Sequence, residues 1–180
     1  MNRRDVLTAT AAAAVATSAE AAEIDRNATI TPGLEFVFRA RVTLGAPLEQ
    51  GVYGEQRHRI IPIAAGVIDG PRFKGKVLPG GGGSSLIRRD EVLEVDVRLS
   101  LETEDMHQIS MAWKGLRHGP KEVMDRLYRG EIVDPGTYYF RTTPYFETSS
   151  EKYGWMNRIC SIAKGSLSAN ARTLDVFQVL

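Results

Sequence analysis

Apolar and polar residues alternate along much of this chain, which is the pattern of strands that bury only one face. The alternation is clearest over residues 92–101, where every second residue is apolar, and it recurs over residues 35–44 and 107–113. Other apolar segments, separated by turn residues, lie at 57–68, 73–78, 137–143, 153–163 and 173–179. The chain therefore predicts an all-β protein of about eight to ten strands, at the spacing typical of a barrel or sandwich.

One segment has the period of a helix. Pro120 suits the first helical position because its missing N–H would have no partner there in any case. Apolar residues then fall at helical spacing up to Tyr128, and Gly130 is typical of a C-terminal cap. This pattern predicts one short helix near residues 120–129.

The strands and the helix fit a closed antiparallel β-barrel. Closure gives every strand two partners, which removes the exposed edges of an open sheet. A barrel of about eight strands has an interior that side chains fill or that holds one small ligand. Since no linker divides the chain after its first residues, we assign residues 22–180 to a single barrel domain.

The N-terminal residues have a different composition. Arg3 and Arg4 precede an Ala- and Thr-rich stretch that is too short to cross a bilayer as a helix, and residues 19–21 fit a small-residue cleavage site. This arrangement predicts a signal peptide over residues 1–21, and the paired arginines followed by Leu7 resemble a twin-arginine export signal. The mature protein is expected in the periplasm, with no stable membrane insertion after cleavage. The alternative is an Ala-rich amphipathic or unstructured N-terminus.

Charge and composition exclude several classes of protein. The 23 Lys and Arg residues and 22 Asp and Glu residues leave a net charge of +1, whereas nucleic-acid binders usually show a basic excess, so no nucleic-acid partner is expected. A single cysteine allows neither an internal disulfide nor a Cys-based zinc site. The three histidines lie far apart, and the glycine run at 80–83 lacks the Lys-Ser/Thr of a phosphate-binding loop. We therefore expect no metal and no cofactor, and a flexible loop at the barrel mouth for residues 80–83.

Six segments, in this order along the chain, resemble one known family. They are residues 57–63, 70–81, 101–105, 115–120, 138–148 and 153–157. The ordered set is similar to the bacterial and fungal family called domain of unknown function 3237, from about Leu34 to Leu180. The resemblance implies a closed antiparallel barrel of the lipocalin or allene-oxide-cyclase-like kind and no settled activity. In the family pattern an acidic residue and an aromatic residue follow the Gly-rich turn, whereas Gly83 and Ser84 stand near those places here.

The predicted strand at 137–143 carries the best candidates for catalysis. Tyr139 and Arg141 share one face of it, and Glu147 follows nearby. If this face points inward, Arg141 needs an acidic partner or an anionic ligand, because an unpaired buried charge is costly. We predict Glu147 as the base, with Tyr139 and Arg141 stabilising an enolate or phenolate oxygen. The alternatives are a structural ion pair between Arg141 and Glu147, or a surface position for Arg141 if Phe140 faces the core.

Four further residues are predicted to bind a ligand. Trp155 and Asn157 share a face of the predicted strand at 153–163, and they combine apolar area with hydrogen-bonding groups, which suits an aromatic or carbonyl compound. Arg59 would attract an anion to the mouth, and His118 is of a residue type that changes charge near neutral pH. The alternatives are that Trp155 lies in the core, that Asn157 forms hydrogen bonds at a strand end, that Arg59 lies on an exposed strand edge, and that His118 caps a turn.

Two functions of different classes fit these features. The first is a barrel that binds an apolar, aromatic or cyclic small molecule and catalyses a cofactor-independent isomerisation, cyclisation or lyase-type proton transfer. The second is a non-catalytic periplasmic binding or carrier protein, in which Arg141 neutralises Glu147. A purely structural barrel would need a filled interior. Barrels of this type often associate, so a homo-oligomer is compatible with either function.

Overall fold

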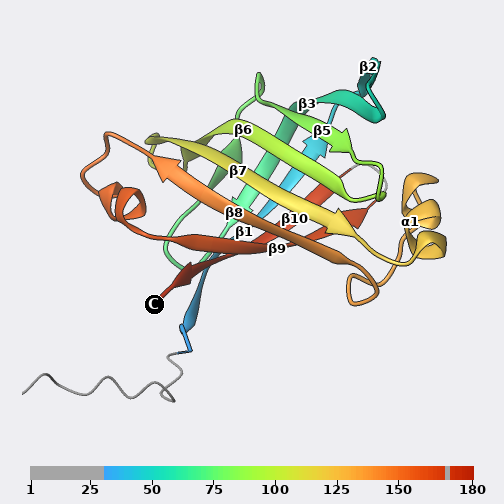
Figure 1. The fold of residues 1–180 in the computed structure, drawn as a ribbon. Coiled ribbons are helices and arrows are strands. Elements are labelled where there is room, and N and C mark those ends of the chain that lie inside the picture. The colour runs from blue at the N-terminus through green and yellow to red at the C-terminus, as the bar shows by residue number, and fades with distance from the viewer. Residues whose placement is uncertain (1–30, 169–170) are drawn as a thin grey trace, which may run out of the picture. The chain divides into compact units, whose positions relative to one another are not determined.

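Strands make up most of the chain in the computed structural model, which describes residues 31–168 and 171–180 (Figure 1). The predicted signal peptide at residues 1–21 lies outside these described residues. In chain order the strands are β1 (Leu34–Leu44), β2 (Leu48–Tyr53), β3 (Gln56–Asp69), β4 (Lys74–Val77), β5 (Gly82–Ile87), β6 (Leu93–Thr103), β7 (Gln108–His118), β8 (Tyr139–Glu147), β9 (Ser161–Ser168) and β10 (Ala171–Val179).

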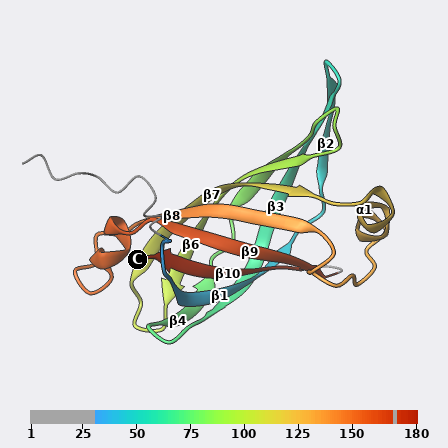
Figure 2. The ribbon, with the colours of Figure 1, turned by 60° about the horizontal axis from the view of Figure 1, so that its bottom comes forward.

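The strand pairing closes the sheet on itself. The order runs β1, β10, β9, β8, β7, β6, then β4 and β5, then β3, and β3 pairs with β1 to complete the ring. All these pairs are antiparallel. Among the described strands β2 pairs with β3 alone, and Figure 2 shows this hairpin extending beyond the barrel. The predicted all-β, closed antiparallel barrel is therefore confirmed.

Two helices mark opposite ends of the barrel. The helix α1 (Lys121–Tyr128) confirms the helix predicted near residues 120–129, and it buries Met124 and Leu127. The 3₁₀ helix η1 (Gly154–Arg158) is the orange-red coil at the other end of the barrel in Figure 1. Neither helix in the described part of the chain is long and apolar enough to cross a membrane.

The strand predicted over residues 153–163 is wrong in its first part. That part forms η1 instead, and β9 begins only at Ser161. The buried residues Tyr153 and Met156 are three positions apart, which is the period of a 3₁₀ helix rather than of a strand. Consequently Trp155 and Asn157 do not share a strand face. Cys160, between this helix and β9, is exposed.

The glycine run is divided between a bulge, which holds Gly80 and Gly81, and the start of β5 at Gly82 and Gly83. Val77 pairs with Gly66 and Gly82 pairs with Pro62, so the chain between the two segments is one residue longer than the facing stretch of β3. β4 and β5 thus form one barrel position, interrupted by a bulge at residues 78–81. Gly80 in this bulge has a φ of +99°, in the left-handed region that favours glycine. The expectation of a mouth loop over residues 80–83 is therefore wrong for Gly82 and Gly83, which belong to a strand.

Aromatic side chains fill the η1 end of the barrel. The Phe38 ring lies 5.2 Å from that of Phe73 and 5.8 Å from that of Phe146, and the Phe73 ring lies 5.6 Å from that of Tyr153 (centroid distances), all in edge-to-face contact. Such pairs contribute beyond the area they bury. We call the region around these four rings the packed end. The opposite end, beside α1, is hollow.

Candidate ligand cavity

A cavity of about 470 Å³ opens at the α1 end of the barrel. Its volume is within the range of sites that hold a small organic molecule. Most of its wall is apolar, and eight strands contribute to it; its apolar residues include Val42, Val97, Trp113, Phe140, Leu167 and Leu174. The interior is therefore only partly filled by its own side chains, and we call this region the cavity end.

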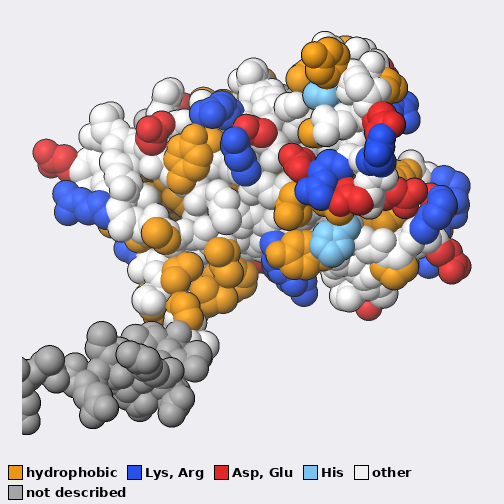
Figure 3. All heavy atoms as spheres, in the orientation of Figure 1, with side chains coloured by type: hydrophobic (Ala, Val, Ile, Leu, Met, Phe, Trp, Pro, Cys, Tyr) orange, Lys and Arg blue, Asp and Glu red, His pale blue; other side chains and the backbone are white. Residues whose placement is uncertain are grey.

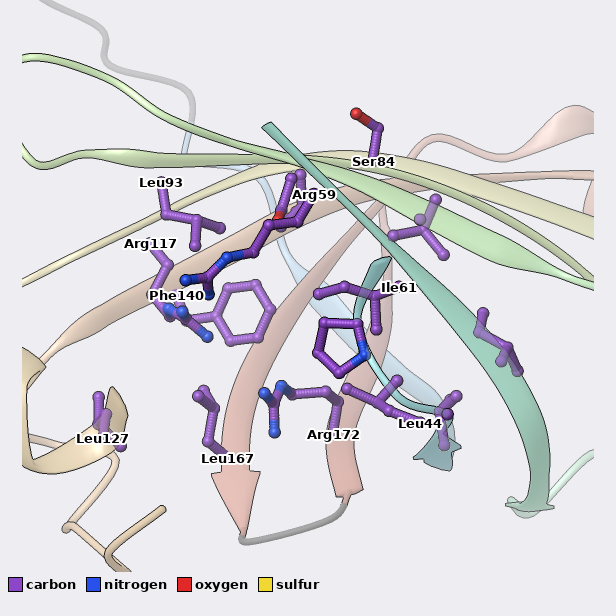
Figure 4. Close-up of a pocket in the computed structure, with 18 of the residues that line it drawn as sticks. Leu44, Arg59, Ile61, Ser84, Leu93, Arg117, Leu127, Phe140, Leu167 and Arg172 are labelled. Carbon is purple, nitrogen blue, oxygen red and sulfur yellow. The ribbon is translucent and has the colours of Figure 1, made fainter. Parts of the chain in front are cut away.

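Three arginines enter this apolar wall because of strand alternation. Arg117 shares the inward parity of Trp113 on β7, and Arg172 shares that of Leu174 on β10. Arg59 occupies an inward position of β3. Figure 4 shows Arg59 and Arg117 beside the ring of Phe140, and Arg172 entering the cavity from another side, beside Leu167.

Arg117 is the most deeply buried of the three. The residue is 6% exposed, and its Nε has no hydrogen-bond partner. Its guanidinium lies 5.7 Å from the ring centroid of Tyr128 and 5.9 Å from that of Phe140. Burial lowers the pKa of Arg117, the neighbouring Tyr128 partly opposes that shift, and the charge of Arg59 lowers it further. Within the described residues no carboxylate pairs with Arg117, which is an unusual state for a buried cation.

Arg172 is held by the backbone and not by an acid. Its Nη1 donates hydrogen bonds to the carbonyl oxygens of Ser168, at 3.2 Å, and of Ala171, at 3.1 Å. Burial lowers the pKa of Arg172 to about 10, and the charge of Arg117 contributes to that shift. Two like charges therefore line the same cavity, where they repel each other.

Two carboxylates near the mouth already have partners. Glu49 Oε1 lies 2.9 Å from Arg59 Nε, in a charge contact whose N–H is not aligned for a hydrogen bond, and Arg57 contacts the same carboxylate. Glu131 lines the cavity but accepts hydrogen bonds from Arg126 and Arg129, which hold the pKa of Glu131 below its usual range. The charges of Arg117 and Arg172 remain uncompensated.

Uncharged polar groups lie in the wall and beside it. Ser85 Oγ is buried without a hydrogen-bond partner, and Ser85 lines the cavity from β5. The Tyr138 hydroxyl accepts a hydrogen bond from the Leu167 backbone N–H at 3.0 Å, and Tyr138 also affects the pKa values of Arg117 and Arg172. A polar ligand group placed between the arginines would have hydroxyl groups close by.

The predicted catalytic residues lie on the outer face of β8. Tyr139 and Glu147 are exposed and Arg141 is partly exposed, because Phe140 takes the inward position between Tyr139 and Arg141. Arg141 donates a hydrogen bond to the Phe140 carbonyl oxygen at 3.0 Å and lies 5.1 Å from the Tyr139 ring. Arg141 and Glu147, both among the described residues, form no ion pair with each other. None of the three lines the cavity.

The predicted ligand-binding residues are scattered. Arg59 lines the cavity, whereas His118 is exposed and its ring stacks on that of Tyr139, with centroids 4.9 Å apart. Trp155 lies in η1, at the packed end, where the Arg72 guanidinium lies 3.4 Å from its ring centroid.

Asn157, in η1, is hydrogen-bonded to the residue that follows β8. Its Oδ1 accepts a hydrogen bond from the Thr148 N–H at 2.9 Å, and its Nδ2 donates one to the Thr148 carbonyl oxygen at 2.8 Å. The structure thus brings Arg59 together with Arg117 and Arg172, and it separates all of them from the other predicted site residues.

The outer face has a groove of its own, with a different charge pattern. This groove, of about 770 Å³, is lined by Tyr139 and Arg141 together with Glu94, Asp96 and Lys114. Lys114 lies 3.5 Å from Asp96, and Arg88 lies 3.2 Å from Glu94. Figure 3 shows acidic and basic side chains intermixed over this side of the molecule. The groove therefore lacks the unbalanced charge of the cavity.

Sequence reasoning missed Arg117 and Arg172. Both stand at positions where the alternation of their strand predicts an apolar residue. Arg117 is four residues from Trp113 on β7 and Arg172 is two residues from Leu174 on β10, so each arginine lies on the inward face of its strand. A charged residue on the apolar parity of a strand is the signal that would have identified them.

These features define a class of protein, a closed antiparallel β-barrel with a cationic cavity at one end. The chain belongs to the family described as "Protein of unknown function (DUF3237)", which matches residues 32–179. A UPF0311 protein of Rhodopseudomonas palustris is 37% identical over 153 residues, 84% of this chain and 100% of that protein. Its crystal structure, described as a conserved protein of unknown function, superposes with a TM-score of 0.82 at 36% identity over the same shares of the two chains.

Two further relatives extend the comparison. A beta-barrel like protein of Acinetobacter baumannii has a TM-score of 0.74 at 32% identity, over 86% of this chain and 100% of that one. A hydroalkoxylation enzyme of Penicillium herquei is 27% identical over 130 residues, 71% of this chain and 70% of that protein. An enzyme structure from the same fungus has a TM-score of 0.66 at 23% identity, over 85% and 98% of the two chains, a likeness of fold.

Proposed function

We propose that the barrel binds an apolar, aromatic or cyclic small molecule that carries an acidic oxygen group. The apolar part would contact Trp113, Phe140 and Leu174, and the anionic group would bind at Arg117. The observation that carries this proposal is the Arg117 side chain, which is buried beside a cavity and has no carboxylate partner. An uncompensated buried charge is costly, so an anion that pairs with it gains binding energy.

A matched pair of probes tests the proposal. Naphthalene-2-carboxylate and naphthalene-2-carboxamide have the same ring system and differ in charge. The carboxylate is expected to raise the melting temperature of the protein and the amide to leave it nearly unchanged, because a ligand stabilises the state that binds it. Arg117→Met should remove the response, and Arg41→Met, on the exposed face of β1, should keep it. Equal responses to both probes would contradict the assigned role of the charge.

Catalysis is a second candidate function, which the hydroalkoxylation enzyme of Penicillium herquei supports. Hydroalkoxylation adds an alcohol O–H across a carbon–carbon double bond, a proton-transfer reaction of the cyclisation type. In this chain Arg117 would stabilise an enolate or phenolate oxygen. Tyr128, which lines the cavity beside Arg117, would be the group that exchanges a proton with the substrate.

Product analysis separates an enzyme from a carrier. Compounds that raise the melting temperature, drawn from phenols, terpenoids and keto acids, are incubated with the protein and recovered. An isomerised or cyclised product that forms with the wild type and not with Tyr128→Phe supports catalysis. Unchanged recovery of every bound compound would favour the carrier function. Glu147→Gln, outside the cavity, tests the role predicted from the sequence for that residue.

We also propose that the protein is exported to the periplasm through the twin-arginine route. Supports for this proposal are the paired Arg3 and Arg4 and the family match, which begins only at residue 32. Replacing both arginines by lysine should retain the full-length chain in the cytoplasm, while the wild type is recovered in the periplasmic fraction. N-terminal sequencing of the periplasmic form should start at Ala22.

A further inference from the structure

The cavity holds more positive charge than one acidic group would balance. Arg117 and Arg172 both line it, and among the described residues neither forms an ion pair with a carboxylate. The third arginine, Arg59, contacts Glu49, a carboxylate that it shares with Arg57. Glu131, the carboxylate in the wall, is bonded to Arg126 and Arg129. Two uncompensated guanidinium groups therefore face the same space.

These two groups are anchored on different walls. Arg117 projects from β7 and Arg172 from β10, and β8 and β9 lie between those strands in the closed sheet. The Arg117 guanidinium lies near the rings of Tyr128 and Phe140, while that of Arg172 is bonded to backbone carbonyl oxygens of its own hairpin. Figure 4 shows the two side chains approaching the cavity from different sides, with Leu167 beside Arg172 and Phe140 beside Arg117. Each guanidinium therefore has a position of its own.

Two like charges that line one cavity also repel each other. The charge of Arg117 contributes to lowering the pKa of Arg172, and among the described residues no carboxylate pairs with either guanidinium group. A single anion paired with Arg117 would leave Arg172 uncompensated. Two acidic groups on one ligand would balance both guanidinium groups and relieve the repulsion.

We infer that the occupant of this cavity is a dianion: a compact apolar, ring-containing molecule with two acidic oxygen groups, one bound by Arg117 and the other by Arg172. This inference rests on the proposed function of the same cavity and specifies the class of compound that it takes. The rings of Phe140 and Trp113 would contact the apolar core between the two acidic groups.

Three probes with one ring system test the inference. Naphthalene-2-carboxylate carries one acidic group, and naphthalene-2,3- and naphthalene-2,6-dicarboxylate carry two at different spacings. Affinities are measured by calorimetry on the purified chain near neutral pH. At least one dicarboxylate should bind about tenfold more tightly than the monocarboxylate, since a charge-assisted hydrogen bond contributes at least that factor.

Variants assign the two halves of the site. Arg172→Gln should remove the advantage of the dicarboxylate and leave the affinity for the monocarboxylate nearly unchanged, whereas Arg117→Met should weaken the binding of all three probes. Arg41→Met, on the exposed face of β1, should alter none of these affinities. Circular dichroism confirms that each variant is folded, and Arg172→Met replaces Arg172→Gln if the latter does not fold.

The outcomes separate this inference from the proposed function. If the monocarboxylate binds and neither dicarboxylate binds more tightly, the site takes a single anion and the dianion inference is overturned. The same holds if a dicarboxylate keeps its advantage in the Arg172 variant. If none of the three carboxylates binds, the proposed function falls and the inference falls with it.

Discussion

The two ends of the barrel follow the same alternation and differ in what fills them. Along β7 the inward residues run from Ile109 and Met111, fully buried at the packed end, to Trp113 and Arg117 at the cavity end. β10 runs the other way, from Arg172 and Leu174 in the cavity wall to buried Val176. The difference teaches that the packed end stabilises the fold, while the cavity end holds groups that the fold alone does not need.

The largest expected effect is at the packed end. Phe38→Ala should lower the free energy of unfolding by about 3–5 kcal/mol, because it leaves a cavity among three other aromatic rings that have little room to collapse. Urea denaturation measures the loss. Phe36→Ala is the matched control, since Phe36 is largely on the outer face of the same strand and has Phe177 as its aromatic neighbour. Losses of equal size at both positions would contradict the assignment of the packed end.

At the cavity end we expect a substitution to change the free energy of unfolding in the opposite direction. Arg117→Met should raise the free energy of unfolding of the ligand-free protein by about 1–4 kcal/mol, because it replaces an unpaired buried cation by an apolar side chain of similar length. The same variant should lose anion binding. Arg41→Met should change neither property. A destabilised Arg117→Met protein would show that this guanidinium has a structural partner after all.

A smaller effect is expected from the pH dependence of anion binding. Arg172 has its pKa lowered to about 10 by burial, from an ordinary value of 12.5. Because the pKa of Arg172 is lower in the folded state than in the unfolded state, the folded protein loses this proton first as the pH rises. Below about pH 10 the Arg172 side chain is charged, and above that value it becomes neutral. Dicarboxylate affinity should therefore stay level near neutral pH and fall as the pH approaches 10. In Arg172→Gln this fall should be absent.

The smallest effect is expected at an exposed acid near the packed end. Hydrogen bonds from Lys152, Thr103 and Tyr153 hold the pKa of Asp105 well below its usual range. The ionised carboxylate thus contributes stability that is present above the ordinary Asp value and is lost as the pH falls through the lowered one. The stability difference between wild type and Asp105→Asn should shrink on acidification, as urea denaturation at successive pH values measures. A difference independent of pH would exclude the ionised form as its source.

Much of the fold was predictable, because alternation states directly which residues of a strand face inward. It predicted β1, β6, β7 and the closure of the sheet, as well as the helix α1. It failed for β2, whose residues are all exposed and leave no apolar pattern. It failed also at residues 153–158: Tyr153, Trp155 and Ile159 alternate with other residues as in a strand, but the buried residues are Tyr153 and Met156, three positions apart.

The site was less predictable than the fold. Tyr139, Arg141 and Glu147 are polar residues that cluster in sequence, and this clustering suggested a site. Phe140 takes the inward position on β8, so the three polar side chains lie on its outer face. Arg59, Arg117 and Arg172 lie on three different strands and meet only through barrel closure. All three are charged residues at strand positions where the alternation places apolar residues, and this property is visible in the sequence. Which strands meet at one end of the barrel depends on the pairing order, which the sequence does not show.

The bulge between β4 and β5 is a place in the barrel where the number of residues in the chain can vary. Since these two segments share one position, β4 pairs only near the packed end and β5 only near the cavity end. An insertion or deletion of two residues at 78–81 would shift β5, with Ser85, along the cavity wall while the register of β4 stays fixed, because an even shift keeps each side chain on its face. The outline of the ligand site can thus diverge among relatives, or be engineered, without disturbing the aromatic core.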